Sequence, residues 1–333
     1  MNTKRFELVD FLKGFSIFTI VVMHLLQPIF SSGVMSKAIA FGGAGVHVFI
    51  LCSGFGLYLS YLHKPLSYEQ FLRRRFIKIY IPYIIVITIS AIIPFYNTSD
   101  SKWIEYASHL LLFKMFFNEY ECSYGGQMWF VSTIIQFYLL WPIIISFYKH
   151  TKKVNNKLPI IISALLSLIW ATSVSIIGRN DYRVWNSFFL QYYWEFVLGV
   201  LIADMYNKNA DLINIPKYKH LIITCIIGLS LTAFAGFKGG ILKVYNDLPS
   251  LIGYLSLALI IYKIAICNRF FLITNKWSYE WYLVHILVFA CVYHIIGLTN
   301  IKLSNYINLA IALTTSYIFA YLYHKVLHLI KLK

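Results

Sequence analysis

Charged residues are scarce in this chain. Only 13% of its 333 residues are Asp, Glu, Lys or Arg, while 59% are hydrophobic. A soluble domain carries about 25% charged residues, which cover its apolar core. The sequence therefore excludes a water-soluble protein. Its apolar runs are continuous and do not alternate with polar residues, so a membrane β-barrel is disfavoured as well.

The signatures of several common binding sites are also missing. The sequence contains no P-loop, no dinucleotide-binding fingerprint, no cluster of metal ligands, no internal repeat and no low-complexity segment. Its five cysteines form no CxxC pair, which argues against a disulfide framework and against a zinc site. We therefore expect neither a metal nor a permanently bound cofactor.

Apolar runs of about 20 residues recur along the whole chain, a pattern typical of polytopic helical membrane proteins. The sequence predicts an all-α membrane bundle that forms a single domain, residues 1–333, without a soluble domain. About ten transmembrane helices are expected, at 8–30, 39–61, 76–96, 127–148, 158–177, 186–206, 219–237, 247–266, 278–298 and 306–328. The segment 103–118 is apolar on one side but carries Glu105, His109 and Lys114, which predicts an amphipathic or re-entrant helix.

Basic residues are distributed unevenly between the predicted loops. With a cytoplasmic N-terminus, 21 of the 29 Lys and Arg residues lie on the cytoplasmic side and the other 8 lie outside. Because basic loops stay in the cytoplasm, we expect both termini inside, in the cytoplasmic membrane of a bacterium. The net charge of +16 then reflects orientation and contact with anionic lipid, and not nucleic-acid binding. Lys4 and Arg5 precede the first apolar run without a convincing cleavage site, so an uncleaved first span is predicted.

Three ionisable residues interrupt the first apolar run, DFLKGFSIFTIVVMHLLQP: Asp10, Lys13 and His24. A helix turns about 100° per residue, so that Lys13 and His24 lie about 20° apart and Asp10 shares their face. The helix rise places His24 roughly 16 Å beyond Lys13. Ionisable groups inside a span are costly and mark functional sites. A snorkelling lysine and a packing histidine are the alternatives for each residue alone, but the shared face favours a common polar channel.

The second predicted span begins FGGAGVHVFILCSGF, residues 41–55. Its glycines permit a close helix approach or a broken entry. His47 and Ser53 are polar groups within this apolar run. Tight packing of small residues and a polar site both explain this span.

Four cations stand before the third span, in FLRRRFIKIYIPY: Arg73, Arg74, Arg75 and Lys78. Such a cluster suits a stop signal that anchors the chain to membrane lipid. It equally suits a ligand that carries several phosphates.

Two later spans also carry ionisable groups. Glu195 lies in the middle of the sixth span, where a lone carboxylate must pair or take up a proton. The ninth span opens SYEWYLVH and holds Ser278, Tyr282 and His285. An aromatic belt at the membrane interface explains the aromatic residues there as well as a binding site does.

These motifs, in this order, resemble the acyltransferase family 3 membrane proteins, which O-acylate sugars and related acceptors. That family opens its first helix with an Asp-Gly-Leu-Arg-like start and places a histidine 11 residues after the basic residue. DFLK supplies Lys13, and His24 falls on that spacing. GGAGVHVFILCSGF is similar to the family's GGxGVxxFFxLSG, and Arg75 and Lys78 match its R..R motif. MWFVSTIIQFYLLWP, EFVLGVLIAD and SYEWYLVH resemble three later helices, so that the match is collinear over nearly the whole chain.

The chain also departs from this pattern at three positions. His47 stands where many members have a small acidic residue, Gln127 where many have histidine, and Ile134 where many have glutamate.

The resemblance implies transfer of an acyl group, typically acetyl from acetyl-CoA, to a hydroxyl of a carbohydrate or lipid-linked glycan. His24 would act as general base, and Glu195 would orient it or balance its charge. The acceptor would enter from the outer side. The cytoplasmic acyl-CoA would be bound by Lys13, Arg73, Arg74, Arg75 and Lys78.

Other polar and aromatic residues of the motifs are expected to line the site. Asp10 is predicted to pair with Lys13 or with the cluster Arg73–Arg75 and to shape the donor entrance. The remaining predicted lining residues are His47, Ser53, Trp129, Tyr138, Ser278, Tyr282 and His285.

Two other functions are compatible with the shared polar face of Asp10, Lys13 and His24. A transporter or flippase for a glycan or an anionic small molecule could use it, although no repeat or paired broken helices support that reading. A sensor or assembly partner could have kept the fold without catalysis, but the presence of Lys13 and His24 argues against this.

Overall fold

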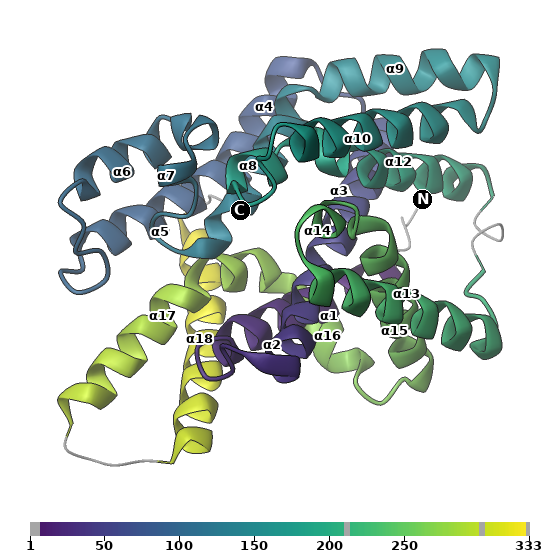
Figure 1. Ribbon diagram of the computed structural model, residues 1–333. Coiled ribbons are helices and arrows are strands. Elements are labelled where there is room, and N and C mark those ends of the chain that lie inside the picture. Colours follow the sequence, from purple (N-terminus) through teal and green to yellow (C-terminus); the bar gives the residue numbers. More distant parts are fainter. Residues whose placement is uncertain (1–6, 210–213, 300–303, 331–333) are drawn as a thin grey trace.

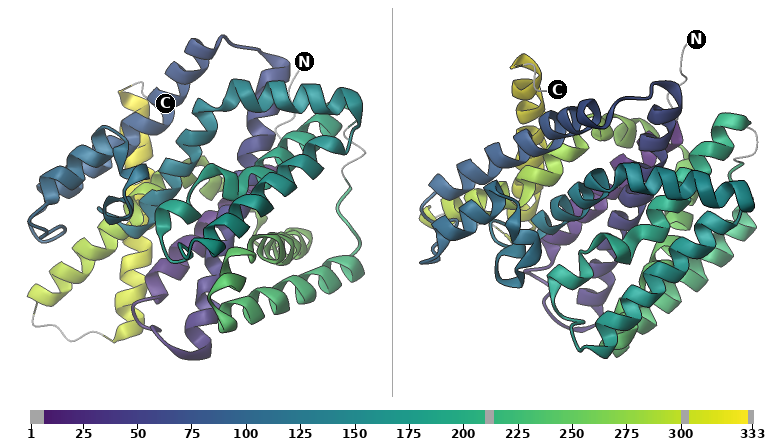
Figure 2. Two further views of the ribbon diagram at one scale, coloured as in Figure 1. Left: turned by 45° about the horizontal axis from the view of Figure 1, so that its top comes forward. Right: turned by 90° about the horizontal axis from the view of Figure 1, so that it is seen from above.

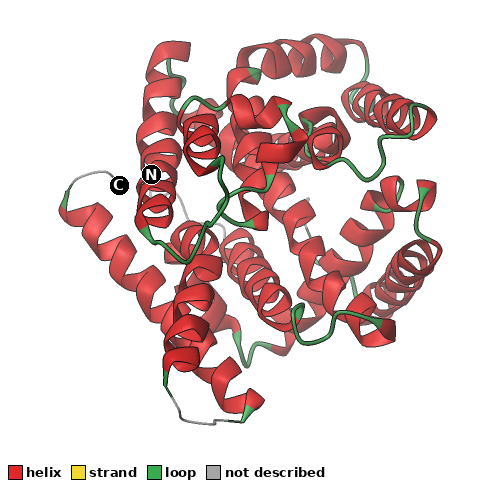
Figure 3. Ribbon diagram, turned by 60° about the vertical axis from the view of Figure 1, so that its left-hand side comes forward, coloured by secondary structure: helices red, strands yellow, loops and turns green. Residues whose placement is uncertain are grey.

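The computed structural model describes residues 7–209, 214–299 and 304–330, and within these ranges every regular element is a helix (Figure 1, Figure 3). Nine of the described helices are long and apolar enough to cross a membrane, and one bent pair raises the number to ten. The prediction of an all-α polytopic bundle is therefore confirmed. Five of the basic residues on which the predicted orientation depends lie outside the described residues: Lys4, Arg5, Lys302, Lys331 and Lys333.

The first half of the chain supplies the helices that will surround the site. It forms α1 (Glu7–Leu26), α2 (Gly33–Ala40), the 3-10 helix η1 (Phe41–Ala44), α3 (Gly45–His63), α4 (Tyr68–Arg75), the π-helix η2 (Phe76–Tyr80), α5 (Ile81–Ile92), α6 (Lys102–Leu110), η3 (Phe113–Phe116), α7 (Asn118–Glu121), η4 (Gly126–Met128), α8 (Trp129–Leu139) and α9 (Trp141–Val154).

The described part of the second half contains six long helices together with short ones. It forms α10 (Leu158–Ile176), α11 (Arg183–Asn186), η5 (Phe189–Tyr192), α12 (Tyr193–Lys208), α13 (Tyr218–Lys238), α14 (Ile241–Val244), α15 (Asp247–Ile264), α16 (Asn268–Thr274), η7 (Asn275–Trp277), α17 (Ser278–Leu298) and α18 (Asn305–Leu329). Helices α13 and α15 lie side by side, as do α17 and α18 (Figure 1).

The bundle is built around α1, which contacts α3, α16 and α17 (Figure 2). Two glycines let α3 and α12 approach closely. A Cβ atom on Gly54 would lie 2.1 Å from the carbonyl oxygen of Phe196, and one on Gly199 would lie 2.0 Å from that of Leu51. Small residues at such positions allow membrane helices to pack backbone against backbone.

One predicted span is broken. The expected helix 127–148 divides at Leu140, and the segments Gly126–Leu139 and Trp141–Val154 meet at 59°. Pro142 follows the break and lies at the start of α9. Proline lacks a backbone N–H and clashes with the preceding turn, so the helix cannot continue through it. The expectation of one straight span is corrected to a bent pair.

The segment 103–118 does not form a span, as expected. It folds into the short helices α6, η3 and α7 beside α5 (Figure 1). The chain turns after α6 at Leu112 and again at Tyr124, both of which have positive φ. This segment therefore folds back against α8 and not across the bundle.

Candidate active site

A cavity of about 1300 Å³ lies at one end of the bundle. It is lined by the C-terminal end of α1, the start of α3, η4 and α8, η5, and facing parts of α13, α15 and α17. Exposed charged residues belong to its lining: Lys37, Asp181, Arg183 and Lys243. The cavity is large enough for a substrate-sized ligand, since small-molecule sites span about 300–1,000 Å³.

His24 lines this cavity and is paired with a second histidine. Its Nδ1 lies 2.9 Å from Nε2 of His285, which is completely buried on α17. Nδ1 of His285 lies 3.0 Å from the carbonyl oxygen of Trp281. A carbonyl can only accept, so Nδ1 of a neutral His285 carries the proton and its Nε2 is an acceptor. His24 must then donate from Nδ1, which leaves the lone pair of the ring on Nε2.

Another histidine, His47, lines the same cavity and lies beside two carboxylates. Nδ1 of His47 lies 2.8 Å from Oε1 of Glu195, which is completely buried on α12. Nε2 of His47 lies 3.9 Å from Oδ1 of Asp247, whose other oxygen accepts a 2.6 Å hydrogen bond from Gln191. The partner of Glu195 is therefore His47, and the expectation that it orients or balances His24 is corrected.

Aromatic side chains form another part of the cavity wall. Trp129 stacks on Tyr192 at 6.0 Å between ring centroids, and the guanidinium of Arg183 lies 5.1 Å over the Trp129 ring. The Tyr282 hydroxyl donates to the main-chain oxygen of Gln127. All five residues line the cavity, among them Trp129 and Tyr282, two of the predicted lining residues.

The cations predicted to bind the acyl donor, acyl-CoA, do not line this cavity. Helix α1 runs from Lys13 to His24, and α4 follows the end of α3 that is distant from His47. The Arg75 guanidinium lies 5.4 Å from the Phe71 ring centre and 5.6 Å from that of Tyr138, and its buried Nε has no hydrogen-bond partner among the described residues.

The other cations predicted to bind acyl-CoA lie on the first half of α1, on α4 and on η2, at the end of the bundle that we call the cationic end. Arg73, Arg74 and Lys78 are exposed, and Lys13 is partly buried on α1. Lys78 belongs to the π-helix η2. Single π turns inside α-helices are frequent at functional sites.

Four further predicted residues lie outside the cavity lining. Asp10 accepts a 2.8 Å hydrogen bond from Asn275, a partner that the sequence did not indicate. Ser53 donates to the carbonyl oxygen of Phe49 at 2.7 Å, and Ser278 donates to that of Asn275 at 3.0 Å. Tyr138 is buried beside Arg75. The two serine side chains bond their own helical segments, as serines in apolar helices commonly do.

Sequence reasoning missed several residues of the site. Asp247 is the first residue of α15, a position at which an acidic residue is common in any helix. Arg183 follows a polar loop and has no feature in the sequence that indicates a site. Tyr192 reads as part of an aromatic belt. Only the fold brings these residues to the cavity.

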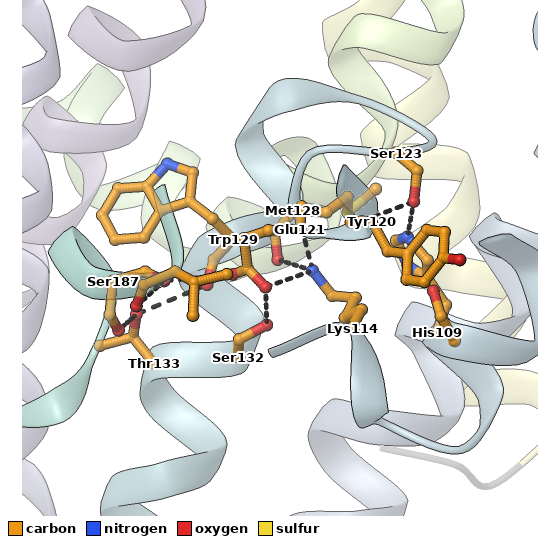
Figure 4. A network of polar contacts seen from close by, with 12 residues as sticks. His109, Lys114, Tyr120, Glu121, Ser123, Met128, Trp129, Ser132, Thr133 and Ser187 are labelled. Atoms are coloured by element: carbon orange, nitrogen blue, oxygen red, sulfur yellow. Dashed lines mark hydrogen bonds and ion pairs between the residues drawn. The ribbon is translucent and has the colours of Figure 1, made fainter. Parts of the chain in front are cut away.

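A buried polar network supports the cavity wall from behind (Figure 4). It contains Lys114 and Glu121, both completely buried, and the serines and threonine around them. At its edge His109, also completely buried, contacts the Tyr83 hydroxyl and, at 2.7 Å from Nε2, the Ser123 hydroxyl. Burial, together with the nearby Lys114 ammonium, holds the pKa of His109 well below its usual range.

The depressed pKa of His109 predicts acid sensitivity of the fold. Below about pH 6.5 the unfolded chain takes up a proton that the folded chain refuses, so stability falls by up to about 1.4 kcal/mol per pH unit. Thermal unfolding of the purified protein should therefore shift to lower temperature between about pH 7 and pH 5. A His109→Gln variant keeps hydrogen-bonding capacity without titrating and should lose part of this slope. Equal slopes for both proteins would contradict the assignment.

The fold and site define a polytopic membrane protein with two histidines, His24 and His47, in the wall of one cavity. A family model described as an acyltransferase domain matches residues 6–325. The chain therefore belongs to this family of membrane acyltransferases. No curated protein and no solved structure matches the chain.

Proposed function

We propose that this protein is an O-acyltransferase that moves an acetyl group from acetyl-CoA to a hydroxyl of a carbohydrate or lipid-linked glycan. The observation that carries the proposal is the hydrogen-bonded series from Trp281 through His285 to His24. It supports a neutral His24 whose Nε2 can accept a proton, as a general base in acyl transfer must.

The reaction requires two proton transfers, one to His24 and one from it. The acceptor hydroxyl gives its proton to Nε2 of His24 while its oxygen attacks the thioester carbonyl. The C–S bond then breaks, and the CoA thiolate takes the proton back from His24. The products are the O-acylated acceptor and free CoA. His285 stabilises the cationic intermediate by accepting from Nδ1 of His24.

We place the donor at the cationic end of the bundle and the acceptor in the His24 cavity. CoA carries phosphates, for which Lys13, Arg75 and Lys78 offer charge-assisted hydrogen bonds. The distribution of basic residues supports a cytoplasmic position for this end and for both termini. The acyl-bearing arm of CoA then has to reach roughly 16 Å, the helix rise between Lys13 and His24.

The proposal is tested by following the acetyl group. Membranes that contain the protein are given acetyl-CoA labelled in the acetyl group, and alkali-labile label is measured in the glycan fraction. We expect label that depends on the protein. Substrate counterflow without acyl-CoA, in the absence of any label transfer, would support a transporter instead.

Replacement of Arg75 by alanine should weaken donor binding selectively. A hydrogen bond to a charged group contributes about 1.5–3 kcal/mol, so the KM for acetyl-CoA should rise roughly 10- to 100-fold with little change in kcat. Lys219→Ala, which removes an exposed cation at the start of α13, serves as the control and should leave KM unchanged. An unchanged KM in Arg75→Ala would place the donor elsewhere.

A further inference from the structure

The ion pair between Lys114 and Glu121 is buried and hydrogen-bonded to main-chain groups. Both side chains are completely buried, and Nζ lies 3.9 Å from Oε2 of Glu121. Nζ also donates to two main-chain oxygens, that of Glu121 at 3.0 Å and that of Met128 at 3.2 Å (Figure 4). The lysine thereby fixes the start of α8 to the short helix α7.

The carboxylate of Glu121 extends the network to a third segment. It accepts from the Ser187 hydroxyl at 3.3 Å and from the Ser132 hydroxyl at 3.5 Å. The main-chain oxygen of Ser187 accepts from Thr133 at 2.6 Å. One buried pair therefore joins α7, the start of α8 and the residues that lead into η5 (Figure 4).

Each of the three joined segments contributes to the cavity wall. Five residues next to the bonded positions line the cavity: Cys122, Gln127, Trp129, Arg183 and Tyr192. Cys122 follows Glu121 in the chain. Gln127 and Trp129 flank Met128, and Arg183 and Tyr192 lie on either side of Ser187 in the chain. Neither member of the ion pair lines the cavity. The pair thus stands behind the wall, where Lys114 is bonded to main-chain oxygens of the segments that form it.

The wall is also bonded to the helix that carries His285. Tyr282 donates to the main-chain oxygen of Gln127, and Gln127 donates to that of Leu283 at 3.5 Å. His285 lies three residues after Tyr282 and contacts His24. A shift of η4 would therefore disturb the partner of the catalytic base.

Stability alone does not account for a buried ion pair. Desolvation offsets most of the attraction between the charges, and apolar replacements of similar volume are commonly as stable. Burial does lower the pKa of Lys114 and raise that of Glu121, the cost that desolvation imposes on both charged forms. What apolar residues cannot supply is the set of directional bonds to Met128, Ser132 and Ser187.

We propose that Lys114 and Glu121 are positioning residues, which hold the Gln127–Trp129 wall in register with Tyr282 and the His24–His285 pair. This role rests on the proposed acyl transfer, because the wall it positions is the acceptor side of the cavity. The proposal explains why two buried charges bond three chain segments that all contribute to the same cavity wall.

The main test replaces both charges together. Lys114→Met alone leaves Glu121 buried without its partner and should lower the unfolding temperature strongly. Lys114→Met/Glu121→Leu should recover most of that loss. We expect the folded double variant to show an acceptor KM at least roughly tenfold higher and an unchanged KM for acetyl-CoA. Wild-type acceptor kinetics in the double variant would overturn the proposal.

A milder variant keeps the test valid if the double variant does not fold. Ser187→Ala removes one hydrogen bond to Glu121 and should raise the acceptor KM several-fold. Ser163→Ala is the matched control, because Ser163 is also buried and its hydroxyl donates to the main-chain oxygen of Ile160 in its own helix, α10. Equal kinetics for the two serine variants would count against the proposal.

Hydrogen exchange separates this proposal from the reaction itself. Amides of residues 125–130 should exchange faster in the double variant and in Ser187→Ala than in Ser163→Ala, whether or not acetyl transfer is detected. Unchanged exchange would overturn the positioning role. Faster exchange without any label transfer by the wild-type protein would instead overturn the proposed function alone.

Discussion

Replacement of His24 by alanine is expected to lower kcat for acetyl transfer by about 10²- to 10⁴-fold, the usual contribution of a general base. The variant should still fold, because His24 is only partly buried at the cavity wall. The KM for acetyl-CoA should change little, since the donor cations lie at the other end of α1. Initial rates with labelled acetyl-CoA measure the effect.

The partner of His24 gives a graded second result. His285→Ala removes the acceptor of the His24 Nδ1 proton, so the ring can rotate or adopt the other tautomer. We expect a smaller loss of kcat than in His24→Ala. His150→Ala, which removes an exposed histidine on α9, should leave the rate unchanged. A well-folded His24→Ala protein with normal activity would remove His24 from the mechanism.

Replacement of Gly54 by alanine should have a large effect on the fold. The new Cβ would lie 2.1 Å from the carbonyl oxygen of Phe196, a distance that no Cβ tolerates. The obstacle is backbone, so α3 and α12 must move apart, and His47 on α3 would separate from Glu195 on α12. Overpacking in a tight core costs about 1–3 kcal/mol and occasionally more.

The control for this variant lies two residues away on the same helix. Gly56→Ala has the same change in composition, but a Cβ there meets nothing within 4 Å. Thermal unfolding in detergent should show a large decrease for Gly54→Ala and none, or a small increase, for Gly56→Ala, because alanine favours helix. Similar decreases in both variants would contradict the close packing of α3 and α12.

Much of the fold could be predicted because membrane helices are local in sequence. Apolar runs gave the all-α bundle and nearly all of its spans, since the membrane itself demands about 20 apolar residues per helix. The break at Leu140 was missed although Pro142 signals it. The run from Trp129 to Tyr148 is continuous in hydropathy, and hydropathy alone cannot distinguish a bent helix from a straight one.

The candidate site could be predicted only in part. Helix periodicity found His24 because its position on α1 is a local property. Its contact with His285 joins positions 261 residues apart, and the contact of His47 with Glu195 joins positions 148 apart. Periodicity does not encode such pairings, which depend on how the helices pack. In the sequence, Lys114 is only one charge in a segment predicted to be amphipathic.

Sealed inside-out vesicles test most directly whether the acyl group passes from the cationic end to the His24 cavity. Labelled acetyl-CoA is added outside, where the cytoplasmic face lies, and the glycan acceptor is enclosed. We predict label on the enclosed glycan, resistant to an added esterase until detergent opens the vesicles, and almost none with His24→Ala. Label only on acceptor outside the vesicles, or equal label with His24→Ala, would contradict the proposed transfer.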